Sequence, residues 1–284
     1  MTDLQTIERK CLGHVLDILE VHGLGHTGGS LSILQLLIAL YFQVARVDPH
    51  NPAWPQRDRI ILSKGHACEA MYAVLAERGY FPTARFKEYL EFGSMLQGHT
   101  EICTPGVEYS AGSLGQGLSF GCGVAQAGRL RGQTYRVFCL LGDGECHGGS
   151  VWEAAMFAAH YQLDNVYALV DYNHYADHDD VDRLMNLQPF QAKWESCGWE
   201  AVYVEQGNHL ESIITTLQGF REPKKPKCLI ANTVKNYGVP SWASKHLHQA
   251  AGETLASGIR EARALLAAAE QRSGGRLQPL PDAR

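Results

Sequence analysis

The sequence predicts an α/β protein with a doubly wound, mostly parallel sheet and helices on both faces. Residues 136–141 and 166–171 each contain a continuous apolar run, which is typical of strands that are buried on both faces. A helical stretch at 150–161 separates these runs and completes a βαβ unit, which is expected to be parallel and right-handed. The strand-loop-helix order recurs at 59–78 and at 201–220. We therefore expect one α/β domain.

The first elements follow from the spacing of apolar residues. From Leu4 to Val21 they recur every three or four positions, which predicts an amphipathic helix that ends at Gly23. Residues 23–30 read as a glycine-rich loop, and Ser30 is suited to cap an apolar helix at 31–44. The other expected elements are a strand at 59–63, helices at 67–78 and from 117, strands at 201–204 and 228–232, and helices at 209–220 and 252–271.

Composition excludes several kinds of partner. The 25 basic and 30 acidic residues give a net charge of −5, so no basic field is available for a nucleic acid. No uninterrupted apolar run approaches the roughly 18 residues that cross a bilayer, and the polar start Met1-Thr2-Asp3 does not resemble a signal peptide. We therefore expect no nucleic acid partner, no membrane partner and a cytoplasmic location. The eight cysteines have no metal-ligand spacing and are expected to be reduced.

Polar residues follow two neighbouring strands. Gly142-Asp143-Gly144-Glu145 comes after the strand at 136–141, and Asn173 follows the strand at 166–171. Parallel strand ends meet at one edge of a sheet, so Asp143 and Asn173 are expected to converge. Together with a backbone carbonyl near Tyr175 they would offer Mg²⁺ the oxygen ligands that it prefers, and glycine amides could reach a diphosphate. From these residues alone, an ordinary strand-to-helix turn remains an alternative.

Seven short motifs, in order along the chain, give a more specific indication. They are His26-Thr27-Gly28-Gly29-Ser30, Ser63-Lys64-Gly65-His66, Gly98-His99-Thr100-Glu101, Gly112-Ser113-Leu114-Gly115-Gln116-Gly117, Gly142-Asp143-Gly144-Glu145, Val151-Trp152-Glu153-Ala154-Ala155 and Asp171-Tyr172-Asn173. Together they resemble the amino-terminal half of a transketolase, over about residues 5 to 250. The segment from Gly142 to Asn173 resembles the thiamine diphosphate fingerprint of that family.

The resemblance implies a thiamine diphosphate-binding fold, with a diphosphate-binding domain at 1–251 and a carboxyl-terminal helix and flexible tail at 252–284. Thiamine diphosphate and Mg²⁺ are the implied cofactors. The implied cofactor contacts are His66, Gly115, Gly142, Asp143, Gly144, Glu145 and Asn173, and the implied metal ligands are Asp143, Asn173 and Tyr175. In the family, a pyrimidine-binding half supplies the glutamate that activates the cofactor, and no match to it is found here. The expected partner is therefore a separate pyrimidine-binding transketolase subunit, in an α2β2 heterotetramer.

Three histidines match the resemblance directly, and two candidates exist for a fourth. His26, His66 and His99 correspond to family positions that face the reacting carbon atoms, where they would donate to substrate hydroxyls and the developing oxyanion and relay protons. His248 is the nearest match by spacing to a fourth, and His246 is a rival. Taken singly, each histidine could instead be a loop or surface residue, but three together favour catalysis.

Two departures from the family pattern leave questions open. Gly148 stands where the family usually has an interface glutamate, so a carboxylate network between subunits is thinned although Glu153 is retained. After Asn173 the family shows an apolar residue and then Asp-Gly, whereas this chain has the acidic loop 176–180. That loop either alters the packing of the thiazolium ring or carries solvated charge.

The expected activity is transfer of a two-carbon ketol unit from a ketose to an aldose, with sugar phosphates as the expected substrates. Alternatives are another thiamine diphosphate enzyme subunit, of the deoxyxylulose-phosphate synthase or 2-oxoacid decarboxylating type, and a non-catalytic regulatory subunit. The three sugar-facing histidines argue against the oxoacid enzymes. Intact Asp143 and Asn173 argue against a subunit without catalysis.

Overall fold

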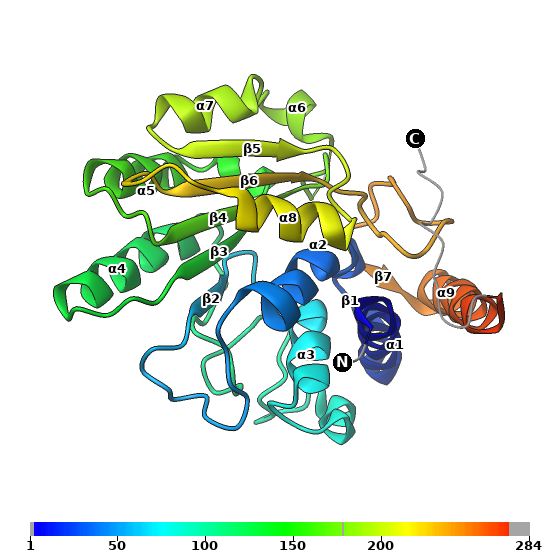
Figure 1. The fold of residues 1–284 in the computed structure, drawn as a ribbon. Helices are drawn as coiled ribbons and strands as arrows, with labels where there is room; N and C mark the ends of the chain where they lie inside the picture. Colours follow the sequence, from blue (N-terminus) through cyan, green and yellow to red (C-terminus); the bar gives the residue numbers. More distant parts are fainter. Residues whose placement is uncertain (1–2, 178, 273–284) are drawn as a thin grey trace.

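The computed structural model describes residues 3–177 and 179–272, and it contains a central sheet of five parallel strands (Figure 1). The strand order is β2-β3-β4-β6-β5, with all four neighbouring pairs parallel. The bounds are β2 Arg59–Leu62, β3 Val137–Gly142, β4 Val166–Tyr172, β5 Glu200–Val204 and β6 Lys227–Asn232. The predicted parallel sheet is therefore confirmed.

The predicted helices lie close to their expected positions, and two further short helices, α6 and α7, were not predicted. Their bounds are α1 Leu4–His22, α2 Thr27–Ala39, α3 Cys68–Arg78, α4 Gly117–Leu130, α5 Gly149–His160, α6 Val181–Leu184, α7 Phe190–Ser196, α8 Leu210–Gly219 and α9 Gly252–Arg272. Shorter elements are a π-helical turn at Leu40–Val44, 3₁₀ turns at Thr83–Glu88 and Gly144–His147, and a two-stranded sheet of β1 Leu24–Gly25 and β7 Ala250–Ala251.

Alternate residues along the strands pack into two separate cores. In β3, Phe138 and Leu140 join the core built with α1, α2, α3 and α8, whereas Val137, Cys139 and Leu141 join the core built with α4, α5 and α7. Because successive side chains of a strand point to opposite faces, this division shows that helices cover both sides of the sheet. The doubly wound α/β class is confirmed.

The start of α2 differs from the sequence prediction. The helix begins at Thr27 and includes two glycines of the predicted loop, and Ser30 lies inside it, so Ser30 is not the cap. The Ser30 hydroxyl donates instead to Glu69. Close packing explains Gly28, because a Cβ there would lie 2.7 Å from the Cε of Lys235. Glycine at this place in the helix therefore allows close packing against another part of the chain.

The segment Thr27–Val44 is long and apolar enough to cross a membrane, and 83% of it is buried inside the protein. All residues of α2 are buried. This burial is typical of a helix at the centre of a folded core.

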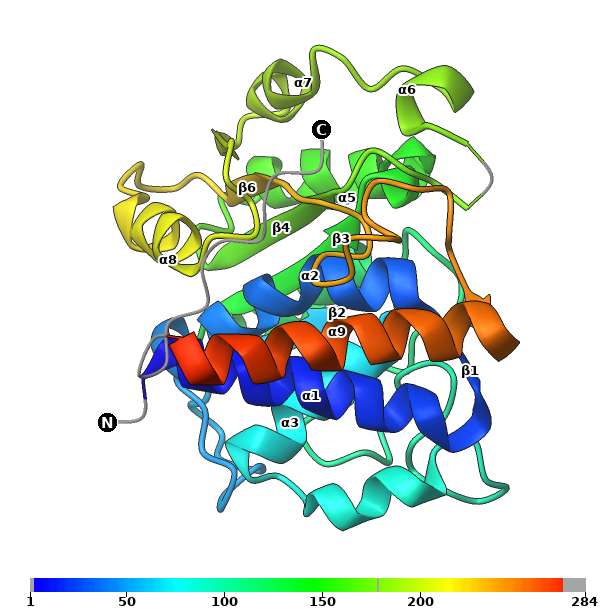
Figure 2. The same ribbon diagram turned by 90° about the vertical axis from the view of Figure 1, so that its right-hand side faces the viewer.

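Helix α9 lies along α1, as the view in Figure 2 shows. Arg263 of α9 pairs with Asp17 at 2.8 Å and with Glu20 at 2.6 Å, both on α1. The helix predicted after residue 251 is therefore present and packed. The domain division at 251/252 stays a prediction, and residues 273–284 of the predicted tail lie outside the described residues.

Candidate functional site at the carboxyl edge of the sheet

Asp143 and Asn173 converge at the carboxyl ends of β3 and β4. The two strands pair in register up to Gly142 opposite Asp171, so the residues that follow leave the sheet side by side. The backbone N–H of Asp143 donates to the carbonyl of Asp171 at 3.2 Å. The Oδ2 atom of Asp143 accepts from the N–H of His174 at 2.7 Å. The expected convergence is thus present in the structure.

The Asp143 carboxylate lies in an environment suited to a cation. Its side chain is buried, and its Oδ1 atom accepts from the Gly144 N–H at 2.8 Å. Burial, together with the negative charge of Asp171, raises the pKa of Asp143 to about 7. Each carboxylate oxygen can accept a further hydrogen bond or bind a cation, because it has a second lone pair. A bound cation would therefore stabilise the charged form that burial disfavours.

The Asn173 amide is oriented by its neighbours. Its Oδ1 atom accepts from the Tyr175 N–H at 3.1 Å, and its Nδ2 atom donates to the Ser32 hydroxyl at 3.2 Å. The Tyr175 hydroxyl donates to the Ser244 carbonyl at 2.7 Å, which fixes the loop after β4. The chemistry of this donor set, with carboxylate, amide and carbonyl oxygens, fits a hard cation. The role of Asp143, Asn173 and Tyr175 as metal ligands stays a prediction.

Two buried lysines lie beside these oxygens. Lys64 forms an ion pair with Asp171 and donates to the Gly29 carbonyl at 3.2 Å. Lys235 donates to the Ala176 carbonyl at 3.1 Å, and burial lowers its pKa to about 8. Neither lysine is assigned a role by the sequence, although Lys64 belongs to one of the seven motifs. Their positive charges would offset the negative charges of a bound diphosphate.

Glu145 and Gly115 contact each other. Glu145 is buried and accepts from the backbone N–H of Gly115 at 2.7 Å, from that of Gly142 at 3.1 Å, and from the Ser63 hydroxyl. Gly115 has φ of 81°, the left-handed region that favours glycine. This network organises the loops around Asp143. Direct cofactor contact by Glu145 and Gly115 stays a prediction.

The four predicted site histidines form one cluster. The ring centroid of His26 lies 5.6 Å from that of His66, 5.7 Å from His99 and 5.5 Å from His248. His66 and His248 are 5.1 Å apart. His246 lies apart from the cluster, with its ring 4.7 Å from Tyr175. The geometry therefore favours His248 over its rival as the fourth site histidine.

Electrostatics keep part of this cluster neutral. Burial, with Lys64 nearby, holds the pKa of His66 well below its ordinary value. Burial, with Lys235 nearby, lowers the pKa of His248 to about 4. A neutral imidazole has one donor and one acceptor nitrogen, so each ring can both give and take a hydrogen bond.

Gln249 contacts the cluster directly, because its Nε2 atom lies 2.6 Å from the Nε2 atom of His26. The other ring nitrogen of His26, Nδ1, is buried and has no hydrogen-bond partner among the described residues. Gln249 belongs to none of the seven motifs, and its position directly after His248 is the only signal that could have indicated it.

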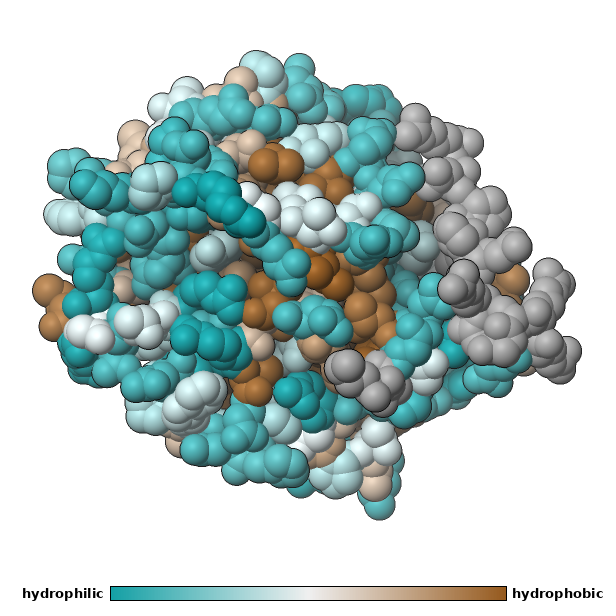
Figure 3. Space-filling view, viewed as in Figure 1, coloured by the Kyte–Doolittle hydropathy of each residue, from teal (hydrophilic) through white to brown (hydrophobic). Residues whose placement is uncertain are grey.

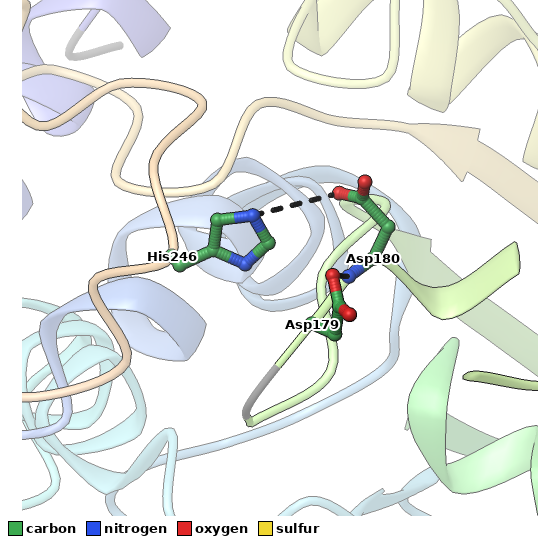
Figure 4. Close-up of side chains that lie close together, drawn as sticks. All are labelled: Asp179, Asp180 and His246. Carbon is green, nitrogen blue, oxygen red and sulfur yellow. Dashed lines mark hydrogen bonds and ion pairs between the residues drawn. The ribbon is translucent and has the colours of Figure 1, made fainter. Parts of the chain in front are cut away.

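The acidic loop after Asn173 divides between two places. Asp177 lies 3.9 Å from His248, so this carboxylate borders the histidine cluster. Asp179 and Asp180 lie with His246 instead, and the imidazole of His246 is 3.8 Å from Asp180 (Figure 4). The ligand atoms of these three side chains lie within 4.8 Å of one another, at a partly exposed surface.

A cleft of about 1220 Å³ lies next to this edge rather than at the histidines. Its lining residues come from α1, α2, α8, α9 and the loops after β5 and β6, and they include His174 and Thr233. Apolar residues gather in a hollow near the middle of the face drawn in Figure 3. None of the four clustered histidines lines the cleft.

Comparisons with known proteins agree on one family. The model of the transketolase thiamine diphosphate binding domain matches residues 8–272. The 6-deoxy-6-sulfo-D-fructose transketolase subunit SqwG of Clostridium sp. (strain MSTE9) is 41% identical over 217 residues, covering 76% of this chain and 79% of that protein. An apulose-4-phosphate transketolase subunit of Phocaeicola vulgatus is 40% identical over 76% of each chain. Human transketolase is 36% identical over 82% of this chain but only 38% of its own length.

Solved structures show the same relationship. Transketolase from Leishmania mexicana superimposes with a TM-score of 0.87 at 26% identity, over 94% of this chain and 42% of that one. Transketolase from Pichia stipitis in complex with sedoheptulose-7-phosphate gives a TM-score of 0.87 at 26% identity, over 93% and 40%. The chain thus spans about two fifths of these transketolases. It belongs to the transketolase family, as a thiamine diphosphate-binding domain.

Proposed function

We propose that this chain is the thiamine diphosphate-binding subunit of a transketolase that transfers a two-carbon ketol unit from a ketose to an aldose. The observation that carries this proposal is the cluster of four histidines beside the edge where Asp143 and Asn173 converge. Two relatives are named as subunits, and this chain matches more than three quarters of each. These names support a separate partner subunit with the pyrimidine-binding domain, and we propose an α2β2 assembly.

The residues present fit the cofactor and its metal. Mg²⁺ would be held by the side-chain oxygens of Asp143 and Asn173 and the carbonyl of Tyr175, with Lys64 and Lys235 offsetting the charge of the diphosphate. When bound, thiamine diphosphate supplies the carbanion and the electron sink for breaking and forming a carbon–carbon bond. The chain itself binds, orients and shields the reacting groups.

The histidines handle hydrogen bonds and protons in this proposal. Neutral imidazoles at His66 and His248 can accept the hydrogen of a substrate hydroxyl or donate to a sugar oxygen. Positioned donors beside a developing oxyanion stabilise it most when water is excluded, and His66 is only partly exposed. His26 and His99 complete a ring of donors and acceptors matched to a polyhydroxylated substrate.

We propose an anionic sugar as the substrate, with phosphorylated ketoses as the first class to test. The names of two relatives specify a sulfonated and a phosphorylated sugar. We also propose a cytoplasmic location, which is supported by eight cysteines that are all free thiols.

The test uses this chain and its pyrimidine-binding partner, purified separately. Ketol transfer between a ketose phosphate and an aldose phosphate is measured with thiamine diphosphate and Mg²⁺ present. We expect negligible turnover from either protein alone and turnover from the mixture, since the activating glutamate belongs to the partner. Substantial turnover by the rigorously purified chain alone would contradict the split-subunit proposal, and none from the mixture would contradict the reaction.

A further inference from the structure

A fully buried carboxylate lies beneath the histidine cluster. The Oε1 atom of Glu69, on α3, accepts from the backbone N–H of His26 at 2.9 Å and from the Tyr89 hydroxyl at 2.8 Å. Its Oε2 atom accepts from the Ser30 hydroxyl at 2.6 Å. Three donors thus converge on a side chain with 0% exposure. Within residues 3–177 and 179–272, no ion pair to a basic side chain accompanies Glu69.

The charged groups around the cluster are distributed unevenly. Lys64 lies beside His66 and Lys235 beside His248. The positive charge of each lysine lowers the pKa of the neighbouring histidine. Glu69 has the opposite effect on His26, as Asp177 has on His248. The titratable and charged groups that face His26 are Glu69 from α3, His66 and His99 from their loops, His248 from the loop before β7, and Asp177 from the loop after β4.

We propose that Glu69 is a positioning residue that anchors the start of α2 and favours the protonated form of His26. His26 can then take up a proton at a higher pH than it would without Glu69, and the imidazolium so formed delivers that proton to a substrate oxygen. In that step an N–H bond of the imidazolium breaks, an O–H bond forms at the oxyanion, and a neutral imidazole remains. The catalytic part of this inference rests on the proposed transketolase function, whereas the coupling between Glu69 and His26 does not.

Burial and Glu69 oppose each other at His26. Burial is the larger influence and lowers the pKa of His26, and the negative charge of Glu69 raises it. An opposite charge within about 4–6 Å shifts a pKa by about one to three units. Without Glu69, the pKa of His26 would therefore lie lower still.

The test is an NMR titration of the histidine rings in the full chain, with neither cofactor nor partner present. Glu69→Gln keeps the shape of the side chain and an acceptor for the His26 N–H but removes the charge. We expect the pKa of His26 to fall by about one unit or more. An unchanged pKa in a folded Glu69→Gln variant would overturn the proposal.

Glu77→Gln is the matched control, because it makes the same change two turns later on α3. Glu77 lies 3.2 Å from His14. The pKa of His14 is raised, since hydrogen bonds to Asp17 and Glu77 outweigh its burial. We expect Glu77→Gln to lower the pKa of His14 and leave that of His26 unchanged. An equal fall at His26 in this control would also count against a specific role for Glu69.

Two further variants serve if Glu69→Gln does not fold. Ser30→Ala and Tyr89→Phe each remove a hydroxyl that donates a hydrogen bond to the Glu69 carboxylate. Each should shift the pKa of His26, because it alters the carboxylate that acts on this ring, and no change in either would overturn the proposal.

The reconstituted complex supplies the catalytic readout. In Glu69→Gln, the limb of the pH profile that reports loss of the His26 proton should move to lower pH, whereas Glu77→Gln should leave it in place. If this limb of the pH profile does not move in Glu69→Gln, only the proposed proton transfer from His26 is contradicted. If the native complex shows no ketol transfer, the proposed function fails, and the NMR titration still decides the coupling between Glu69 and His26.

Discussion

Replacing Asp143 by Asn should stabilise the ligand-free chain at alkaline pH although it removes a residue predicted to bind metal. Burial and Asp171 raise the pKa of Asp143 from 3.8 to about 7. Between these values the unfolded chain has lost the proton and the folded chain still holds it, so stability falls as pH rises. Above pH 7 the side chain is charged in both states, and the penalty is complete and constant.

The size of this effect follows from the shift. One pKa unit corresponds to about 1.4 kcal/mol, so the native chain should lose about 3 kcal/mol of unfolding free energy between pH 5 and pH 8 through Asp143. Asparagine does not titrate in this range. Its amide group will meet the N–H groups of Gly144 and His174 less favourably, at a cost of about 1–3 kcal/mol that is independent of pH.

The assay is urea unfolding of both proteins at pH 5 and pH 8 without metal or cofactor. The stability of Asp143→Asn relative to the native chain should be higher at pH 8 than at pH 5 by about 3 kcal/mol. Asp164→Asn removes a half-exposed carboxylate and serves as the matched control, with no such change between the two pH values. A difference for Asp143→Asn that does not vary with pH would refute the electrostatic reasoning.

Three other outcomes are expected from variants and from pH. Asn173→Ala should abolish metal-dependent binding of thiamine diphosphate in calorimetric titration, and unchanged affinity would refute its assignment as a ligand. In the native chain, the metal-dependent affinity for thiamine diphosphate should fall by up to about tenfold per pH unit below pH 7, because a proton competes with the metal for Asp143. An affinity that does not vary with pH would count against Asp143 as a ligand. Alanine at His26, His66, His99 or His248 should lower turnover of the reconstituted complex about 10²-fold or more, with little change in cofactor affinity. Near-normal turnover in all four variants would show that these histidines are structural and not catalytic.

The sequence predicts the metal edge well because one rule connects distant residues there. Asp143 and Asn173 both follow strands of a βαβ unit, so the direction of the strands alone brings them together. The clustering of His26, His66 and His99 is not deducible from strand order, and only the family resemblance leads one to expect it. The structure brings them together through loops that precede α2 and α3 and a further loop at 98–101.

The buried polar network could not be predicted, because its members are chosen by tertiary packing. Lys64 and Asp171 pair across 107 positions, and Ser32 reaches Asp171 across 139. Glu69 is the one charged residue in the buried stretch 68–76 of α3, and no local pattern shows that its partners are Ser30 and the His26 backbone. Tertiary packing also explains why α2 begins earlier than the sequence predicts. Its first glycines allow close contacts with other parts of the chain and do not form a turn.

A structure of the chain in complex with its partner, thiamine diphosphate and Mn²⁺ in place of Mg²⁺ tests the central claim most directly. Anomalous scattering locates the metal without ambiguity. We predict a metal ion bound by the side-chain oxygens of Asp143 and Asn173, the Tyr175 carbonyl and the diphosphate, with His26 and His248 facing the reactive ring. A metal elsewhere, or a diphosphate bound away from the ends of β3 and β4, would contradict this prediction.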